Sequence, residues 1–176
     1  MSSSFENGAL YMTLNTRGQP GTFHWGIFLP CSGAKGWYYH ATNKSGGWKL
    51  EVKLTNNIRN SRTIVLAYKL GFVSSEAALD QTLRAITDFG PISKRTGETF
   101  SCRTWMKDSL ATLHDKGIVT LPADIGKFYP PAFSKGYFTN KMVEDTLAKK
   151  AFDEATPLEP AIESGTGDLT IMDGTA

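Results

Sequence analysis

Residues 22–42, TFHWGIFLPCSGAKGWYYHAT, decide the fold because their pattern predicts a β-hairpin. Two runs rich in aromatic and β-branched types, residues 23–29 and 37–42, are separated by a stretch that contains Pro, Ser and Gly. Side chains alternate across a strand, so His24 points away from the face that its two neighbours share. The hairpin is therefore expected to place His24 and His40 on strands about 4.8 Å apart, where a hydrogen bond can join them.

Outward from this hairpin, the pattern predicts strands first and helices afterwards. Three more β-rich runs, at residues 11–14, 48–54 and 63–70, complete an expected antiparallel meander. From residue 75 the apolar spacing becomes helical, and the expected helices begin near residues 76, 101 and 140. Strands followed by helices, without strict alternation, predict an α+β domain in which an antiparallel sheet packs against helices.

The length and the charge distribution predict one domain with an acidic end. A chain of 176 residues, 40% of them hydrophobic, is long enough for one sizeable core. Residues 151–176 carry six acidic residues and no Lys or Arg, whereas the first 150 residues hold all 19 basic residues against 11 acidic ones. We expect a single domain over residues 1–154 and a disordered acidic tail over residues 155–176, although residues 169–172 could add a short strand.

Composition also narrows the partners and the compartment. The basic residues are scattered, without a compact cluster or an aromatic-basic signature, which argues against a nucleic-acid partner. No apolar stretch approaches the roughly 20 residues that span a bilayer, and the first residues lack the pattern of a secretory signal. We therefore expect a cytoplasmic protein with no transmembrane segment. Cys31 and Cys102 give no disulfide framework and would stay reduced there.

Cys102 begins the second expected helix, and this position favours a reactive thiol. The positive end of the helix dipole and the unpaired backbone N–H groups stabilise a thiolate and can bind an oxyanion. A cysteine nucleophile also needs a base within hydrogen-bond reach and a group that orients this base. We therefore predict Cys102 as the nucleophile, His24 as the base and His40 as the orienting residue, with Cys102 Sγ within about 4 Å of a His24 ring nitrogen.

Each of these residues also has a structural interpretation. Cys102 lies on the same side of its helix as Met106 and Leu113, so it is also a candidate core residue. If Cys102 is unreactive, His24 and His40 can serve as acid and base in a cyclase or isomerase of a biosynthetic intermediate. A third possibility is a non-catalytic binding or pathway-accessory protein, because a fold does not establish an activity.

The three residues also carry a family resemblance. The segment HWGIF at residues 24–28, the segment YHA at residues 39–41 and a later cysteine at a helix start resemble the circularly permuted papain-like folds of the NlpC/P60 superfamily. The lecithin:retinol acyltransferase-like branch has the closest such pattern. The resemblance covers roughly residues 22–120, and it implies a papain-like fold with His24 as base, His40 as orienting residue and Cys102 as nucleophile.

The helix that carries the cysteine departs from that branch. Residues 100–105, FSCRTW, differ from its Asn-Cys-Glu-His-Phe signature, and this difference argues against lipid acyl transfer. The chain is more similar to small uncharacterised fungal proteins with His-Trp, Tyr-His and Cys-x-x-Trp motifs, some of them encoded beside secondary-metabolite pathways.

The expected function is that of a thiol-dependent acyl hydrolase or acyltransferase. It would act on an amide, ester or thioester of a small molecule or peptide, in the setting of fungal secondary metabolism. No cofactor is expected, because the chain has no P-loop and no Gly-x-Gly-x-x-Gly after a strand. No metal is expected either, because Cys-x-x-Cys and His-Glu-x-x-His spacings are missing. The sequence leaves the substrate and the oligomeric state open.

Overall fold

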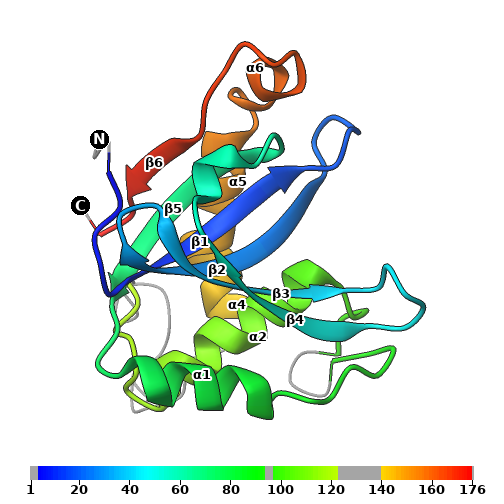
Figure 1. Cartoon of the computed structure of the whole chain (residues 1–176). Helices are drawn as coiled ribbons and strands as arrows, with labels where there is room; N and C mark the ends of the chain where they lie inside the picture. Colours follow the sequence, from blue (N-terminus) through cyan, green and yellow to red (C-terminus); the bar gives the residue numbers. More distant parts are fainter. Residues whose placement is uncertain (1–3, 94–96, 123–139, 176) are drawn as a thin grey trace.

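The protein folds as one mixed six-stranded sheet with its α-helices on one face (Figure 1), which confirms the predicted α+β class. The computed structural model describes residues 4–93, 97–122 and 140–175. The strand order is β4-β3-β2-β1-β5-β6. The strands are β1 (Ala9–Thr16), β2 (Phe23–Ser32), β3 (Lys35–Thr42), β4 (Lys49–Thr55), β5 (Ile64–Phe72) and β6 (Thr170–Asp173). The helical elements are η1 (Ile58–Asn60), α1 (Glu76–Ala85), α2 (Cys102–Asp115), α4 (Asn140–Val143), η3 (Glu144–Ala148), α5 (Lys149–Ala155) and α6 (Glu159–Glu163).

The first four strands form the expected antiparallel meander, but the fifth does not extend it. After β4 the chain crosses back through η1, and β5 pairs antiparallel with β1 on the far side of the hairpin. The prediction of a simple meander is therefore wrong at β5. Local sequence marks each strand, whereas strand pairing across the sheet is decided by which apolar faces meet.

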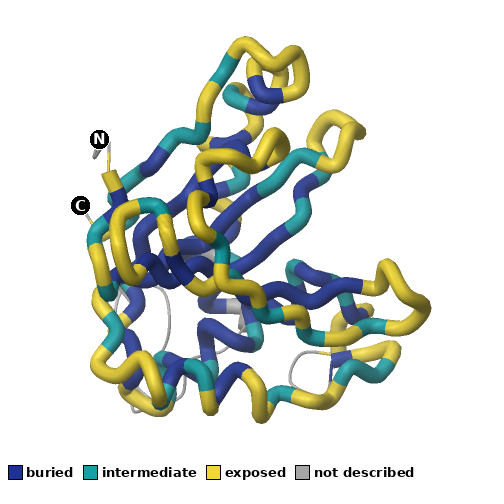
Figure 2. Tube along the Cα trace, viewed as in Figure 1, coloured by how far each residue is buried: buried dark blue, intermediate teal, exposed yellow. Residues whose placement is uncertain are grey.

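The two faces of the sheet are covered by different parts of the chain. The larger core lies between one face and the helices, and its central side chains include Trp25, Tyr39 and Trp105. Figure 1 shows α1 and α2 below the β2–β3–β4 part of the sheet. The opposite face holds a smaller cluster that includes Phe5, Phe28 and Ile58. Figure 2 shows the buried residues along the middle of the sheet and the exposed residues at the hairpin tips.

The helix ends follow the expected capping signals. Ser75 caps α1, because its side chain accepts a hydrogen bond from the backbone N–H of Ala78. Ser101 caps α2 in the same way, through the N–H of Thr104. Gly117, just beyond α2, has φ +69°, a left-handed conformation that glycine adopts without a steric penalty.

The C-terminal segment contains α6 and β6 where a disordered tail was predicted, and β6 is the short strand that residues 169–172 were expected to add. Strand β6 pairs parallel with β5, in a register that aligns Ala67 with Ile171. Ile171 is buried in the smaller cluster, and Ile162 on α6 is buried in the larger core. The acidic composition of the segment hides two short apolar stretches, and burial of these stretches is what orders it.

Candidate functional site

Two histidines from neighbouring strands form the centre of the site. In the β2–β3 pairing Ile27 faces Tyr39, so His24 and His40 project from the sheet face opposite to these two residues. Nε2 of His24 lies 2.7 Å from Nδ1 of His40, and the ring centroids are 4.9 Å apart with the ring planes at 86°. The hydrogen bond that the hairpin pattern predicts is present.

A carboxylate extends this pair into a chain of three residues. Glu51 on β4 lies opposite His40 in the β3–β4 register, and its Oε1 atom is 3.2 Å from Nε2 of His40. An ionised carboxylate only accepts hydrogen bonds, so Nε2 of His40 donates to Glu51 and Nδ1 of His40 accepts from Nε2 of His24. Nδ1 of His24 remains, and among the described residues it has no hydrogen-bond partner.

The surroundings keep both histidines neutral near pH 7. Burial, the positive charge that His40 can carry, and the nearby Arg17 and Lys44 together lower the pKa of His24 to about 4. Burial also lowers the pKa of His40, while its hydrogen bond to Glu51 acts in the opposite direction. A neutral His24 carries a lone pair on one ring nitrogen, so it can accept a proton.

Tyr38 and Gly26 fix the position of His40 from the side. The Tyr38 ring lies 4.8 Å from the His40 ring, centroid to centroid, with the planes tilted by 30°. A Cβ atom at position 26 would lie 2.5 Å from the Tyr38 hydroxyl oxygen, so the phenol occupies the space that only a glycine leaves. Burial raises the pKa of Tyr38, which keeps it a neutral hydroxyl.

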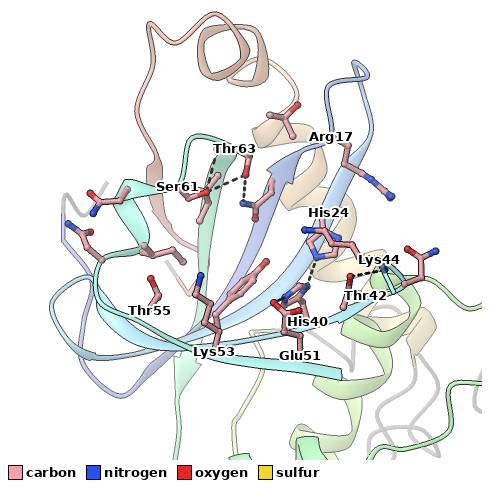
Figure 3. A pocket seen from close by; sticks show the side chains of 18 of the residues that line it. Arg17, His24, His40, Thr42, Lys44, Glu51, Lys53, Thr55, Ser61 and Thr63 are labelled. Atoms are coloured by element: carbon pink, nitrogen blue, oxygen red, sulfur yellow. Dashed lines mark hydrogen bonds and ion pairs between the residues drawn. The ribbon is translucent and has the colours of Figure 1, made fainter. Parts of the chain in front are cut away.

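The histidines line an open pocket of about 720 Å³ on this face of the sheet. Figure 3 shows His24 and His40 between Arg17 and Lys44 on one side and Lys53 on the other. The connection between β4 and β5 forms a further wall, with polar side chains such as Asn57, Ser61 and Thr63. Pockets of this volume are typical of small-molecule sites.

Cys102 lies elsewhere, and the expected contact with His24 is not formed. Its side chain is 2% exposed and belongs to the larger core, beneath the sheet face that carries Trp25. Cys102 and Trp25 border a second hollow, of about 600 Å³, that His24 does not line. Residues 24 and 25 point to opposite faces of β2, so the sheet separates His24 from Cys102. The prediction of Cys102 Sγ within about 4 Å of His24 is corrected accordingly.

Sequence reasoning missed Glu51 and the basic residues of the pocket. The alternation in KLEVKLT, residues 49–55, places Glu51 and Lys53 on one face of a strand. That signal was available, but the register that brings Glu51 to His40 depends on the conformation of the turn before β4. Arg17 and Lys44 lie in turns outside the strands, where no periodic pattern points to the pocket.

Comparison with protein families assigns the chain to a family. The model of a family of unknown function, DUF6540, matches residues 10–120, and the chain belongs to this family. The match spans β1 to β5, α1 and α2, so it includes His24, His40, Glu51 and Cys102. No curated protein and no solved structure matches the chain.

The described residues were also searched for metal sites and for membrane-spanning helices. In this part of the chain no group of three or more His, Cys, Asp or Glu side chains is placed to hold a metal ion. The helices in the same ranges are too short or too polar to cross a membrane.

Proposed function

We propose, for a member of a family with no assigned function, that this protein catalyses proton transfer on a small molecule bound in the pocket. The reaction class is an isomerisation or cyclisation in which His24 takes a proton from one substrate atom and returns it to another. The single observation that carries this proposal is the hydrogen-bonded chain from Glu51 through His40 to His24, which leaves one nitrogen of His24 available.

The proton path follows from the donor and acceptor atoms. Nδ1 of His24 accepts the substrate proton and becomes part of an imidazolium ion, whose Nε2–H already points at Nδ1 of His40. Transfer of the Nε2 proton to His40 moves the positive charge to a ring that faces the Glu51 carboxylate. The same steps in reverse return a proton to the substrate, so the protein ends in its starting state. His24 is the catalytic residue, and His40 and Glu51 are positioning residues.

The low pKa of His24 makes this residue a weak base, and the proposed mechanism must compensate for that. A group with a pKa of about 4 is a weak base at neutral pH, and efficient proton transfer favours a pKa close to the working pH. Glu51 raises the pKa of both histidines, and the relay to His40 spreads the acquired charge toward this carboxylate. We therefore expect Glu51 to matter for the rate although it does not touch the substrate.

The positions of the three predicted residues favour this proposal over thiol chemistry. A cysteine nucleophile needs a base at hydrogen-bond distance, and Cys102 shares neither a hydrogen bond nor a pocket with His24 in the described part of the chain. The thiol-dependent acyl hydrolase or acyltransferase stays a prediction from the sequence. The cyclase or isomerase is the alternative that the site supports better.

A test can proceed without a known substrate. The wild-type protein is incubated in D₂O with a mixture of small metabolites, and mass spectrometry records compounds that gain deuterium or change retention time. We expect such compounds with the wild type and with Cys102→Ser, and a loss of roughly 10²- to 10⁴-fold with His24→Gln. Equal signals from His24→Gln would contradict the proposal. If the wild type changes no compound, a binding or accessory protein becomes the better interpretation.

A further inference from the structure

More cationic than anionic side chains line the pocket. Arg17, Lys44 and Lys53 line it together with one carboxylate, Glu51. Glu51 is already hydrogen-bonded to His40, and none of the three cations has an ion-pair partner among the described residues. By contrast, the buried Lys107 in the helical layer is held by the carboxylates of Glu98 and Glu144. The pocket therefore carries an uncompensated positive charge.

This positive charge acts at the histidines themselves. Arg17 and Lys44 are close enough to lower the pKa of His24, and Lys44 and Lys53 act in the same way on His40. In Figure 3 the labelled side chains of Arg17 and Lys44 lie on the His24 side of the pair, whereas Lys53 lies beyond His40. A ligand that reaches His24 must enter this positive field, because the cations flank the ring.

We infer that the substrate is a small molecule with an anionic group, a carboxylate or a phosphate, that Arg17 and Lys44 hold beside His24. This inference rests on the proposed function and specifies its substrate class. Guanidinium and ammonium groups both form charge-assisted hydrogen bonds with such anions. Burial is the largest cause of the low pKa of His24, and His40, Arg17 and Lys44 lower this pKa further. A bound anion would offset the contribution of the two cations, so binding would raise the basicity of His24 before proton transfer.

The rest of the pocket indicates a polar molecule larger than a simple ion. The wall formed by the connection between β4 and β5 offers hydroxyl and amide side chains, among them Asn57, Ser61 and Thr63, with Ile58 as an apolar contact. A volume of about 720 Å³ is far more than one carboxylate or phosphate needs. The anionic group therefore anchors one end of the ligand, and the remainder extends along the polar wall.

The test uses three probes: malonate, inorganic phosphate and malonamide, the uncharged counterpart of malonate. NMR signals of the His24 and His40 rings report binding. We expect at least one anion to give saturable shifts and to raise the pKa of His24, because a nearby negative charge favours the imidazolium form. His40, Arg17, Lys44 and Glu51 also act on this ring, and all four are present in each titration of the wild-type protein. Malonamide should give no such shifts.

Matched variants locate the anion. Arg17→Gln and Lys44→Gln should each weaken binding of the anion by about tenfold, whereas Lys49→Gln, which removes a charge on β4 outside the pocket, should change it less than about twofold. Saturation by malonate alone assigns a carboxylate, and saturation by phosphate alone assigns a phosphate. The inference is overturned if malonamide binds as tightly as malonate, if neither anion saturates by about 50 mM, or if the two pocket variants bind like the wild type.

These outcomes are separable from those of the proposed function. The probes report binding and are not turned over, so anion binding can be found even if His24→Gln keeps full activity. In that case the proton-transfer proposal fails and the anion site stands. Conversely, a loss of turnover in His24→Gln without anion binding leaves the proton-transfer proposal in place and removes the substrate class.

Discussion

Nε2 of His24 lies 2.7 Å from Nδ1 of His40, although the two residues are sixteen positions apart in the chain. The hydrogen bond joins two neighbouring antiparallel strands, and the second histidine continues to Glu51 at 3.2 Å. Three side chains on β2, β3 and β4 thus fix one another in line across the sheet. The arrangement uses both nitrogens of His40 and one nitrogen of His24, which leaves a single nitrogen for chemistry.

Removal of the Glu51 charge should lower the pKa of His40. The carboxylate opposes the effect of burial on this ring, so in Glu51→Gln that opposition is lost. A pH titration followed by NMR of the His40 ring measures the change. Glu76→Gln, on α1 outside the pocket, removes the same charge as a control. An unchanged His40 pKa in Glu51→Gln would show that the two residues do not interact in solution.

The free energy of unfolding should depend on pH through His24. Its pKa is about 4 in the folded protein and about 6.5 when unfolded, so the unfolded chain binds more protons between these values. The contribution of His24 to the free energy of unfolding is therefore fully present above about pH 6.5. It is lost as the pH drops toward 4, by on the order of 2 kcal/mol after allowance for partial exposure.

Urea denaturation of the wild type and of His24→Gln between about pH 4 and pH 7 tests this dependence. The variant should show a shallower decrease in unfolding free energy over the acidic range. Burial also lowers the pKa of His114, but this residue is common to both proteins and its contribution cancels in the comparison. Identical pH profiles for the two proteins would refute the low pKa of His24.

The two cysteines should differ sharply in reactivity. Cys31 is exposed, whereas Cys102 is 2% exposed within the larger core. We expect iodoacetamide to label Cys31 in the native protein and to label Cys102 only on unfolding. The rate at Cys102 is measured in a Cys31→Ser background, with and without His24→Gln. Fast labelling of Cys102 that slows in His24→Gln would restore the thiol-dependent mechanism.

Gly26→Ala should displace Tyr38 and thereby change the surroundings of His40. The added Cβ would lie 2.5 Å from the Tyr38 hydroxyl oxygen and 2.7 Å from two of its ring carbons, so the Tyr38 ring must move away from its place beside His40. Overpacking of this kind costs typically 1 to 3 kcal/mol. We expect a loss of stability of about that size together with shifted His40 ring signals, whereas Gly33→Ala, at a solvent-exposed turn, should leave the His40 signals in place.

A wild-type-like unfolding free energy and unchanged His40 signals in Gly26→Ala would contradict the close packing of Tyr38 on position 26. Gly33 has φ +60°, so its substitution is expected to cost stability through the backbone without contact with the site. The His40 signals therefore distinguish the two variants more cleanly than stability does.

The histidine pair was predictable from sequence because it depends on local order. Alternation along each strand sets the face of each side chain, and a short hairpin connection sets which strands are neighbours. These two facts place His24 and His40 side by side. The connection between β3 and β4 is longer than that between β2 and β3, so the register that brings Glu51 to His40 emerges only in the folded structure.

The position of Cys102 was missed because it depends on which face of the sheet the helices cover. Trp25 and Ile27 form the more apolar side of β2, and helices bury apolar surface, so α2 packs there and carries Cys102 away from His24. The alternation of β2 contained this signal. The pairing of β5 with β1 and of β6 with β5 arises from contacts distant in sequence, for which the local pattern offers no equivalent signal.

The tautomers of the two histidines at pH 7 test the central claim most directly. Long-range ¹H–¹⁵N NMR distinguishes protonated from unprotonated ring nitrogens and needs no substrate. The account predicts that both rings are neutral, with the proton on Nε2 of His40 facing Glu51 and on Nε2 of His24 facing His40, so that Nδ1 of His24 is unprotonated. A proton on Nδ1 of His24 at pH 7 would contradict the proposed base and with it the proton-transfer function.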